Sequence, residues 1–212
     1  MNAPTTHFYE PDQGHRLPHS PLKAIVAPRP IGWISTLDAA GRVNLAPYSF
    51  FNAVCETPPI VYFSSKGRKD SLRNAEATGE FVANLVTEDL AFAMNETAAE
   101  VGPDVDEMAL AGLEAAPSTI VRPPRVARAA AALECRLLEV RELRDLDGRP
   151  TDWHMVLGQV VGVHIDPRHL KDGLFDTGGA RVMARCGYRG FYAVVDRLVE
   201  ITRPAESSAL AP

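Results

Sequence analysis

The sequence between residues 131 and 165 constrains the fold more than any other part of the chain. Three apolar residues alternate with polar ones near its start: Leu133, Cys135 and Leu137. This period of two is typical of a strand with one buried face. Residues 155–165 are rich in β-branched side chains, and Asp147-Gly148 between the two runs is a typical hairpin turn. The alanine-rich residues 129–132 would suit a helix by propensity, but the alternation favours a long β-hairpin over residues 131–165.

Shorter strands are expected in the first half of the chain, where apolar runs alternate with turn residues. They are Ile31–Leu37, Val43–Phe51, Ile60–Ser64 and Glu80–Val86. Pro47 interrupts the second run, and a proline restricts a strand to the edge of a sheet or to an irregular form. Residues 38–41, Asp-Ala-Ala-Gly, predict a tight turn between the first two runs.

Helical signals are few and lie between the expected strands. We expect three helical segments, over residues 72–78, 88–99 and 106–113. Asp70 or Ser71 would cap the first segment, and Gly79 would end it. Thr87 would cap the second.

The tally is six or seven strands and two or three helices without a regular β-α-β alternation. This pattern disfavours a doubly wound parallel sheet and favours a mainly β protein, a closed barrel with flanking α-helices. A chain of 212 residues suits one domain. We expect an extended N-terminal arm over residues 1–22 that lies across the domain, a folded domain over 23–200, and a C-terminal tail over 201–212.

The charge of the chain argues against two classes of partner. There are 22 Lys and Arg residues against 27 Asp and Glu, a net charge of −5, and the pI is about 5.7. Nucleic acids and anionic membranes usually require a basic face, so we expect neither as a partner. No apolar run approaches the ~18–20 residues of a membrane helix, and the polar N-terminus lacks a signal-peptide pattern. A cytoplasmic location is therefore expected.

The cysteines and histidines show no pattern of a redox or metal site. Cys55, Cys135 and Cys186 are odd in number and far apart, so we expect free thiols without a redox role. Pro18 precludes a regular helix that would align His15 with His19. The other histidines also lack neighbours at ligand spacing, and we predict no metal.

Several catalytic signatures are missing from the sequence. Neither GxGxxG nor GxxxxGK[ST] nor GxSxG occurs. Asp176-Thr177-Gly178 spells the tripeptide of aspartic proteases, but it occurs once, and that chemistry needs two carboxylates. We interpret it as a turn.

Residues 28–74 carry the most informative chemistry. A loop rich in hydroxyls and cations leads into the expected helix, where backbone amides would suit a phosphate; its side chains are Ser65, Arg68, Lys69 and Ser71. Residues 44–51, made irregular by Pro47, would offer unpaired backbone groups to a flat heteroaromatic ring. The alternative is a polar surface loop before a capped helix.

The motifs in this region occur in order with others further along the chain. They are PRPIGWIST, GRVNLAPYSFFN, PPIVYFSS, RKDSLRN and TGEFVANL, followed by Asp106-Glu107, Glu134-Cys135, the run from Gly158 to Ile165, and ARCGY at 184–188. Together they resemble the flavin reductase-like family with the FMN-binding split-barrel fold. The resemblance extends from about Phe8 to Val195.

The resemblance implies a flavoprotein homodimer with FMN near the subunit interface. The residues implied around the ring and ribityl chain are Ser35, Thr36, Asn44, Ala46, Pro47, Tyr48 and Ser49. Those implied around the phosphate are Ser64, Ser65, Lys69, Asp70 and Ser71. Ser71 stands where the family often has threonine, and Met108 where it often has an aromatic residue. Neither departure removes a group that the cofactor needs.

The implied activity is that of an NAD(P)H:flavin reductase, in which NADH or NADPH passes a hydride to flavin N5. Such a reaction requires no catalytic side chain, because the protein supplies binding and orientation. His154 and Arg185 are candidates for the side of the second substrate, and each is equally plausible as a structural residue.

The family leaves other functions open. One alternative is a flavoredoxin-like FMN electron carrier or an FMN-binding module without efficient nicotinamide turnover. A split barrel of another class, like pyridoxamine-phosphate oxidase or a heme-binding protein, is a third. An oxygenase or another electron acceptor is a possible partner.

Overall fold

The long hairpin expected over residues 131–165 is confirmed and lies at the centre of the main sheet. In the computed structural model, which describes residues 6–102 and 104–202, it consists of β9 (Ala131–Arg144) and β10 (Pro150–Ile165). The two strands pair antiparallel, with register shifts at three places along the ladder. Asp145 accepts backbone N–H bonds from Asp147 and Arg149, which fixes the turn.

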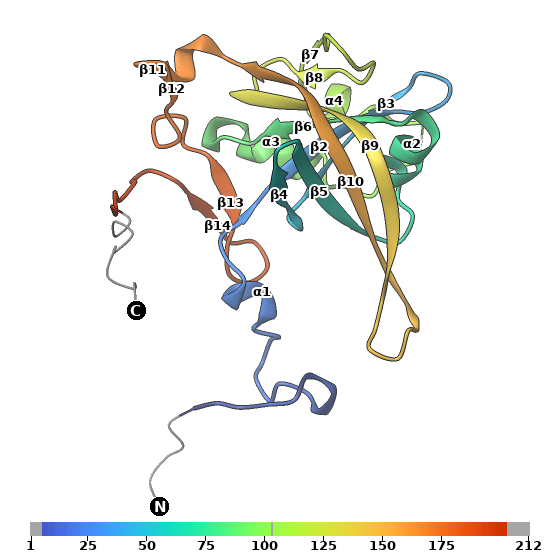
Figure 1. Ribbon diagram of the computed structural model, residues 1–212, viewed down its shortest axis with the longest axis vertical. Coiled ribbons are helices and arrows are strands. Elements are labelled where there is room, and N and C mark those ends of the chain that lie inside the picture. Colours follow the sequence, from blue (N-terminus) through green and yellow to red (C-terminus); the bar gives the residue numbers. More distant parts are fainter. Residues whose placement is uncertain (1–5, 103, 203–212) are drawn as a thin grey trace, which may run out of the picture.

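The other strands of the main sheet flank this hairpin on both sides. They are β2 (Gly32–Leu37), β3 (Val43–Tyr48), β4 (Phe51–Glu56), β5 (Pro59–Lys66) and β6 (Glu80–Leu85). The spatial order is β3-β2-β6-β9-β10-β5-β4, and each neighbouring pair is antiparallel (Figure 1). The mainly β architecture is the one that the sequence predicts.

The sheet curls on itself and encloses an aromatic core. Tyr48 on edge strand β3 packs against Phe63 on β5, with 4.7 Å between ring centroids. Phe63 in turn meets Phe81 of β6 edge to face at 5.5 Å. Contacts between strands that are distant in the sheet order are the signature of a barrel.

One predicted strand is divided in two. The run Val43–Phe51 was expected to be a single irregular strand, but β3 ends at Tyr48 and β4 begins at Phe51. Pro47 lies inside β3, opposite Trp33, and β3 is an edge strand as its proline requires. The sequence did not indicate β4, because its pairing with β5 depends on the chain reversal after residue 48.

The first helix ends where predicted but begins at Asp70, before the predicted start at residue 72, and its cap differs. Helix α2 spans Asp70–Thr78 and ends at Gly79, whose φ of 73° is the left-handed conformation that glycine adopts easily. Lys69 occupies the N-cap position, so the expectation that Asp70 or Ser71 caps the helix is wrong. The Ser71 hydroxyl faces inward and accepts a hydrogen bond from Asn44.

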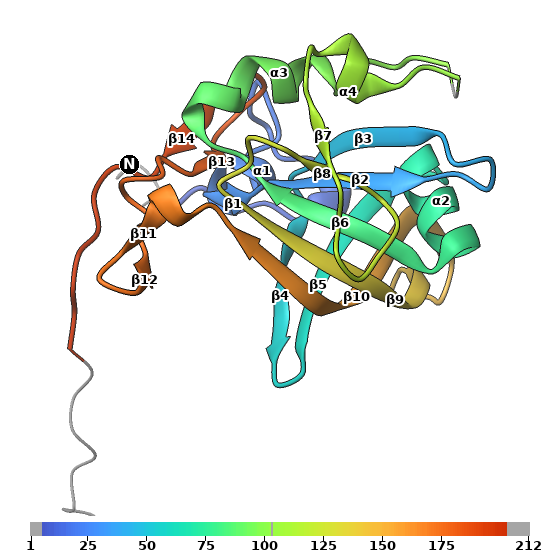
Figure 2. The ribbon, with the colours of Figure 1, turned by 90° about the horizontal axis from the view of Figure 1, so that it is seen from above.

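The remaining helices are shorter than expected. Residues 88–99 form a 3₁₀ turn, η2 (Glu88–Leu90), followed by α3 (Ala91–Glu96), and α4 covers Glu107–Leu110. Thr87 bonds to the Asp89 side chain rather than to a backbone N–H. Asp106 does cap α4 by accepting from two backbone N–H groups. Figure 2 shows α3 and α4 on one side of the barrel.

A small sheet joins the two ends of the chain beside the barrel. Strands β1 (Arg29–Pro30), β13 (Met183–Arg185) and β14 (Tyr192–Val194) lie in the order β1-β13-β14. A second apolar cluster packs between this sheet, α3 and the barrel, and includes Trp33, Leu45, Leu90, Met94 and Met108.

Minor elements complete the described chain. The strand pairs are β7 (Ala115–Ala116) with β8 (Arg125–Val126), and β11 (Leu170–Lys171) with β12 (Leu174–Phe175). The short helices are η1 (Pro11–Gln13), α1 (Leu22–Ile25) and η3 (Pro167–His169). Asp176 accepts from the N–H of Gly179, so the Asp-Thr-Gly tripeptide lies in a turn.

The N-terminal arm was expected to lie across the domain, but its described residues extend away from the barrel in Figure 1. Residues 6–20 are almost all exposed, and His19 contacts Tyr188 at 5.9 Å between ring centroids. Residues 1–5 of the expected arm and 203–212 of the expected tail lie outside the described residues.

A buried carboxylate fixes the loop between β7 and β8. Glu134 on β9 is fully buried and accepts from the N–H groups of Thr119, Ile120 and Val121 at 2.6–2.8 Å. His164 Nε2 lies 2.5 Å from the same carboxylate. Burial alone would raise the pKa of Glu134, but these donors outweigh it and hold the pKa at about 2.

Candidate functional site

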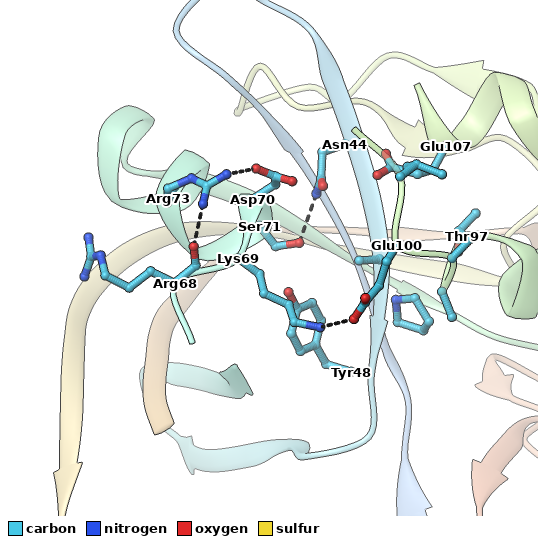
Figure 3. A pocket seen from close by; sticks show the side chains of 15 residues that line it. Asn44, Tyr48, Arg68, Lys69, Asp70, Ser71, Arg73, Thr97, Glu100 and Glu107 are labelled. Carbon is cyan, nitrogen blue, oxygen red and sulfur yellow. Dashed lines mark hydrogen bonds and ion pairs between the residues drawn. The ribbon is translucent and has the colours of Figure 1, made fainter. Parts of the chain in front are cut away.

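A cavity of about 410 Å³ lies between strand β3, the start of α2 and residues 97–101 (Figure 3). This volume is within the range of small-molecule sites. The residues that line it are Asn44, Ala46, Pro47, Tyr48, Arg68, Lys69, Asp70, Ser71, Arg73, Thr97, Ala98, Ala99, Glu100, Val101 and Glu107.

One end of the cavity is built to receive an anion. The first N–H groups of α2 have no partner within the helix. Lys69 occupies the N-cap position, and its side chain makes no capping hydrogen bond. Arg68, Lys69 and Arg73 surround this helix end. Free N–H donors at a helix start, together with cations, favour a phosphate.

The cations at this end are already paired with carboxylates. Arg73 pairs with Asp70, and Arg68 pairs with Glu76 on the outer side of the helix. Lys69 Nζ lies 4.0 Å from Glu100, and Figure 3 shows the two side chains pointing toward one another across the cavity. An entering anion therefore competes with Glu100 for Lys69.

A buried network of amides and hydroxyls supports the wall behind the cations. Asn44 Nδ2 donates to Ser71 Oγ at 2.9 Å and to Thr36 Oγ1 at 3.1 Å. Asn74 on α2 donates to the same Thr36 oxygen at 3.2 Å. These bonds connect β2, β3 and α2, so they fix the position of the helix start relative to the strands.

Tyr48 contributes a buried side chain to the cavity wall. The side chain of Tyr48 is buried, and its hydroxyl has no hydrogen-bond partner among the described residues, although the hydroxyls of Ser71 and Ser65 lie nearby. Burial raises the pKa of this hydroxyl. The hydroxyl has almost no accessible surface, so it supports the wall beside the two serines and does not meet a ligand.

Glu107 is the one acidic residue that lines the cavity from α4. Its carboxylate accepts from the Leu45 N–H at 3.0 Å, and burial raises its pKa. The bond fixes α4 to β3, which places Glu107 as part of the wall.

These features fit the FMN that the sequence resemblance implies. The helix start and its cations suit the phosphate, and Ala46 and Pro47 add apolar side chains that a ring could contact.

The structure brings together part of the predicted cofactor set. The predicted residues that line the cavity are Asn44, Ala46, Pro47, Tyr48, Lys69, Asp70 and Ser71. Thr36 lies behind the wall in the network with Asn44. Ser35 is fully buried and donates to the Pro124 carbonyl at 2.5 Å, on the side of the loop that Glu134 fixes.

The other predicted serines lie beside the cavity. Ser64 and Ser65 are buried in β5, where the Ser65 hydroxyl donates to the Gly67 carbonyl at 2.8 Å. Ser49 lines a second cavity of about 310 Å³, which shares Pro47 and Ala98 with the first.

The two candidates for a second substrate lie in different places. His154 on β10 is in register with Ser65 of β5, and its Nδ1 atom is buried without a partner among the described residues. It lines neither cavity. Arg185 on β13 lines the second cavity, on the side away from α2.

One wall of the site was not predicted from the sequence. Residues 97–101 carry no motif, and their position depends on a hydrogen bond of 2.8 Å from the Trp33 indole to the Thr97 hydroxyl. Arg73 was detectable in principle, because it follows Lys69 by one helical turn.

No helix within the described residues has the length and apolar character to cross a membrane. Across residues 6–102 and 104–202, no group of three His, Cys, Asp or Glu side chains is placed to hold a metal ion.

Most of the chain matches a known protein family. Residues 26–184 match the family model of the flavin reductase like domain. The Bacillus subtilis protein YwrF is 38% identical over 151 residues, which are 69% of this chain and 73% of YwrF.

Solved structures share the fold. Nitrilotriacetate monooxygenase component B from Bacillus cereus has a TM-score of 0.80 and 29% identity, covering 95% of this chain and 98% of that chain. Flavoredoxin of Desulfovibrio vulgaris (Miyazaki F) has a TM-score of 0.71 and 20% identity, covering 86% and 93%. The barrel is the split barrel that the resemblance implied. The family model matches well over half of this chain, and the chain therefore belongs to the flavin reductase-like domain family.

Proposed function

We propose that the protein binds FMN in the larger cavity and acts as an NAD(P)H-dependent flavin reductase. The observation that carries this proposal is the combination of an uncapped helix start and three cations in one cavity of a flavin reductase-like barrel. A surface loop before a capped helix, which was the alternative, would not leave the first N–H groups of the helix without a side-chain cap.

The residues of the chain bind and orient rather than exchange protons. The α2 N–H groups, Lys69 and Arg73 hold the phosphate, and Ser71 is kept in place by Asn44. Glu107 is bonded to the Leu45 N–H and serves the wall. Bound FMN would supply the ring that accepts a hydride from a reduced nicotinamide.

We also propose that the functional unit is a homodimer. A shallow apolar groove on β4, β5, β9 and β10 supports this, with Val54 and Val163 at its rim exposed by 53% and 58%. Exposed apolar surface of this kind is typical of association sites. Light scattering should give about twice the 23.0 kDa of one chain.

The similarity to a monooxygenase component supports electron delivery to a separate acceptor. Component B of nitrilotriacetate monooxygenase covers almost the whole chain at 29% identity. We propose that this protein likewise passes reducing equivalents onward, either to a partner oxygenase or to another acceptor.

An anaerobic titration tests the proposed function. The protein is mixed with FMN, and binding is followed by quenching of flavin fluorescence; NADH or NADPH is then added while absorbance near ~450 nm is recorded. Rapid bleaching with either nicotinamide is the expected result. Bound FMN that bleaches only slowly would support the flavoredoxin-like carrier instead, and failure to bind FMN would refute both.

A further inference from the structure

We propose that the second cavity, beside the proposed FMN site, binds the anionic group of the second substrate, with Arg185 and Arg189 as the residues that hold it. The inference rests on the proposed function, because it takes the larger cavity as the place of FMN. The ligand class is an organic anion with an apolar body. Two sources share this chemistry, the diphosphate of a nicotinamide dinucleotide and the carboxylate of a small aromatic acid.

The cavity has an apolar floor and a polar rim. Ile31 and Met94 form part of the floor and are 4% and 2% exposed, and Pro47 and Tyr192 add flat surface. The polar residues that complete the lining are Ser49, Asn95, Arg185 and Arg189. An apolar body with a charged group would therefore find a partner for each part.

The charge of this cavity is uncompensated. No Asp or Glu occurs among the residues that line it, and within the described chain neither Arg185 nor Arg189 has a carboxylate within 4.0 Å. Arg29 on β1 stands opposite Arg185 of β13 in the ladder. Burial, with Arg185 nearby, lowers the pKa of Arg29, so the arginines repel one another. A bound anion would relieve this repulsion.

The guanidinium of Arg185 is already positioned. It lies over the Tyr192 ring at 4.6 Å and donates to the Phe191 carbonyl at 3.3 Å. A guanidinium has five N–H donors, so this single hydrogen bond leaves others for a ligand. An arginine held in place loses less conformational entropy when it binds.

The position of the cavity connects it with the flavin ring. It shares Pro47 and Ala98 with the larger cavity, whereas the phosphate end of that cavity lies at Lys69 and Arg73. The shared wall is thus at the ring end of the proposed FMN. Figure 2 shows β13 and β14 near α3, the helix that supplies Met94 and Asn95. A substrate anchored here would reach the ring with its apolar part.

The test compares Arg185→Gln, Arg189→Gln and the double variant with the wild type. Arg136→Gln is the matched control, because Arg136 is exposed on β9 and lines neither cavity. Arg185→Lys keeps the charge, and its partial recovery separates charge from packing on Tyr192. Thermal unfolding checks that each variant is folded.

FMN affinity is measured first, and it should stay within about 2-fold in every variant. The KM for NADH and NADPH should then rise by about 10-fold for each arginine removed, with kcat changed less, if the anion is the dinucleotide diphosphate. If the anion is an aromatic carboxylate, KM stays unchanged and benzoate perturbs the flavin absorbance of the wild type but not of the double variant. Either pattern supports the anion subsite.

Two results would overturn the inference. One is loss of FMN affinity in the double variant by as much as any substrate effect, since the arginines would then belong to the FMN site. The other is that neither pyrophosphate nor benzoate, measured by calorimetry on the protein with and without FMN, distinguishes wild type from double variant. Because the calorimetry also runs without FMN, failure of the subsite is distinguishable from failure of the proposed function.

Discussion

Replacing Glu134 by glutamine should lower the free energy of unfolding by about 3 kcal/mol at pH 7. The pKa of Glu134 is held at about 2, against 4.5 for an ordinary glutamate. One pKa unit corresponds to about 1.4 kcal/mol, so a shift of about 2.5 units contributes ~3 kcal/mol in favour of the folded, ionised form. Glutamine has nearly the same shape but no charge, and it offers a single acceptor oxygen to three backbone donors.

The stabilisation by Glu134 must decrease as the pH falls. Because the folded-state pKa lies below the unfolded value, the stabilisation is fully present above about pH 4.5 and is lost as the pH falls toward about 2. The difference between wild type and Glu134→Gln should therefore shrink from pH 5 downward. Urea unfolding followed by fluorescence of Trp33, which is fully buried, measures this difference at each pH.

A control on the same strand removes the general effect of charge. Glu139 is exposed and paired only with Arg141, so Glu139→Gln should change stability by less than about 0.5 kcal/mol. The reasoning is refuted if Glu134→Gln unfolds within that same margin of wild type at pH 7. A difference that stays constant down to pH 3 would contradict it equally.

Other predictions concern the proposed site. Lys69→Ala should weaken FMN binding by about 10-fold, the lower end for a charge-assisted contact because Lys69 is exposed, and should leave riboflavin binding unchanged; an equal loss for both ligands would reject the phosphate assignment. Glu100→Gln should tighten FMN about 2–5-fold at low salt by freeing Lys69, which equilibrium titration at two salt concentrations measures. Burial raises the pKa of the Cys135 thiol, so changing Cys55, Cys135 and Cys186 together to alanine should leave the rate of flavin reduction within a few-fold, as stopped-flow absorbance would report.

The parts of the fold that the sequence predicts are those set by local periodicity. The β9–β10 hairpin follows from alternating residues around Asp147-Gly148, and the end of α2 follows from Gly79. The predicted cap of α2 was wrong because residue type alone favours Asp70 and Ser71 as caps, whereas Lys69 occupies the N-cap position. The hydroxyl of Ser71 is instead used by Asn44, a partner 27 positions away that no local rule can reveal.

In the candidate site as well, residues marked by local sequence were predicted and residues placed by distant contacts were not. Lys69, Asp70 and Ser71 were predicted because a loop before a helix is visible in the sequence. Residues 97–101 were missed because a contact with Trp33, 64 positions earlier, brings them to the cavity. Ser35 was included by resemblance, yet its hydroxyl bonds to Pro124, and only the three-dimensional position of the 117–124 loop shows this.

The two neighbouring cavities differ in what an entering anion must displace. In the larger one, Lys69 faces Glu100 and Arg73 pairs with Asp70, so a phosphate gains less from these cations than their number suggests. The N–H donors at the start of α2 must then contribute a larger share of phosphate binding, and the backbone supplies them whatever the side chains are. In the smaller cavity, Arg185 and Arg189 face no carboxylate among the described residues, and an anion there depends on two side chains. A single substitution can remove recognition by an arginine side chain, but it leaves the backbone N–H donors of α2 in place. With the two cavities assigned as proposed, the choice of second substrate is the property that can change most easily on this barrel, while the proposed place of the flavin phosphate stays fixed.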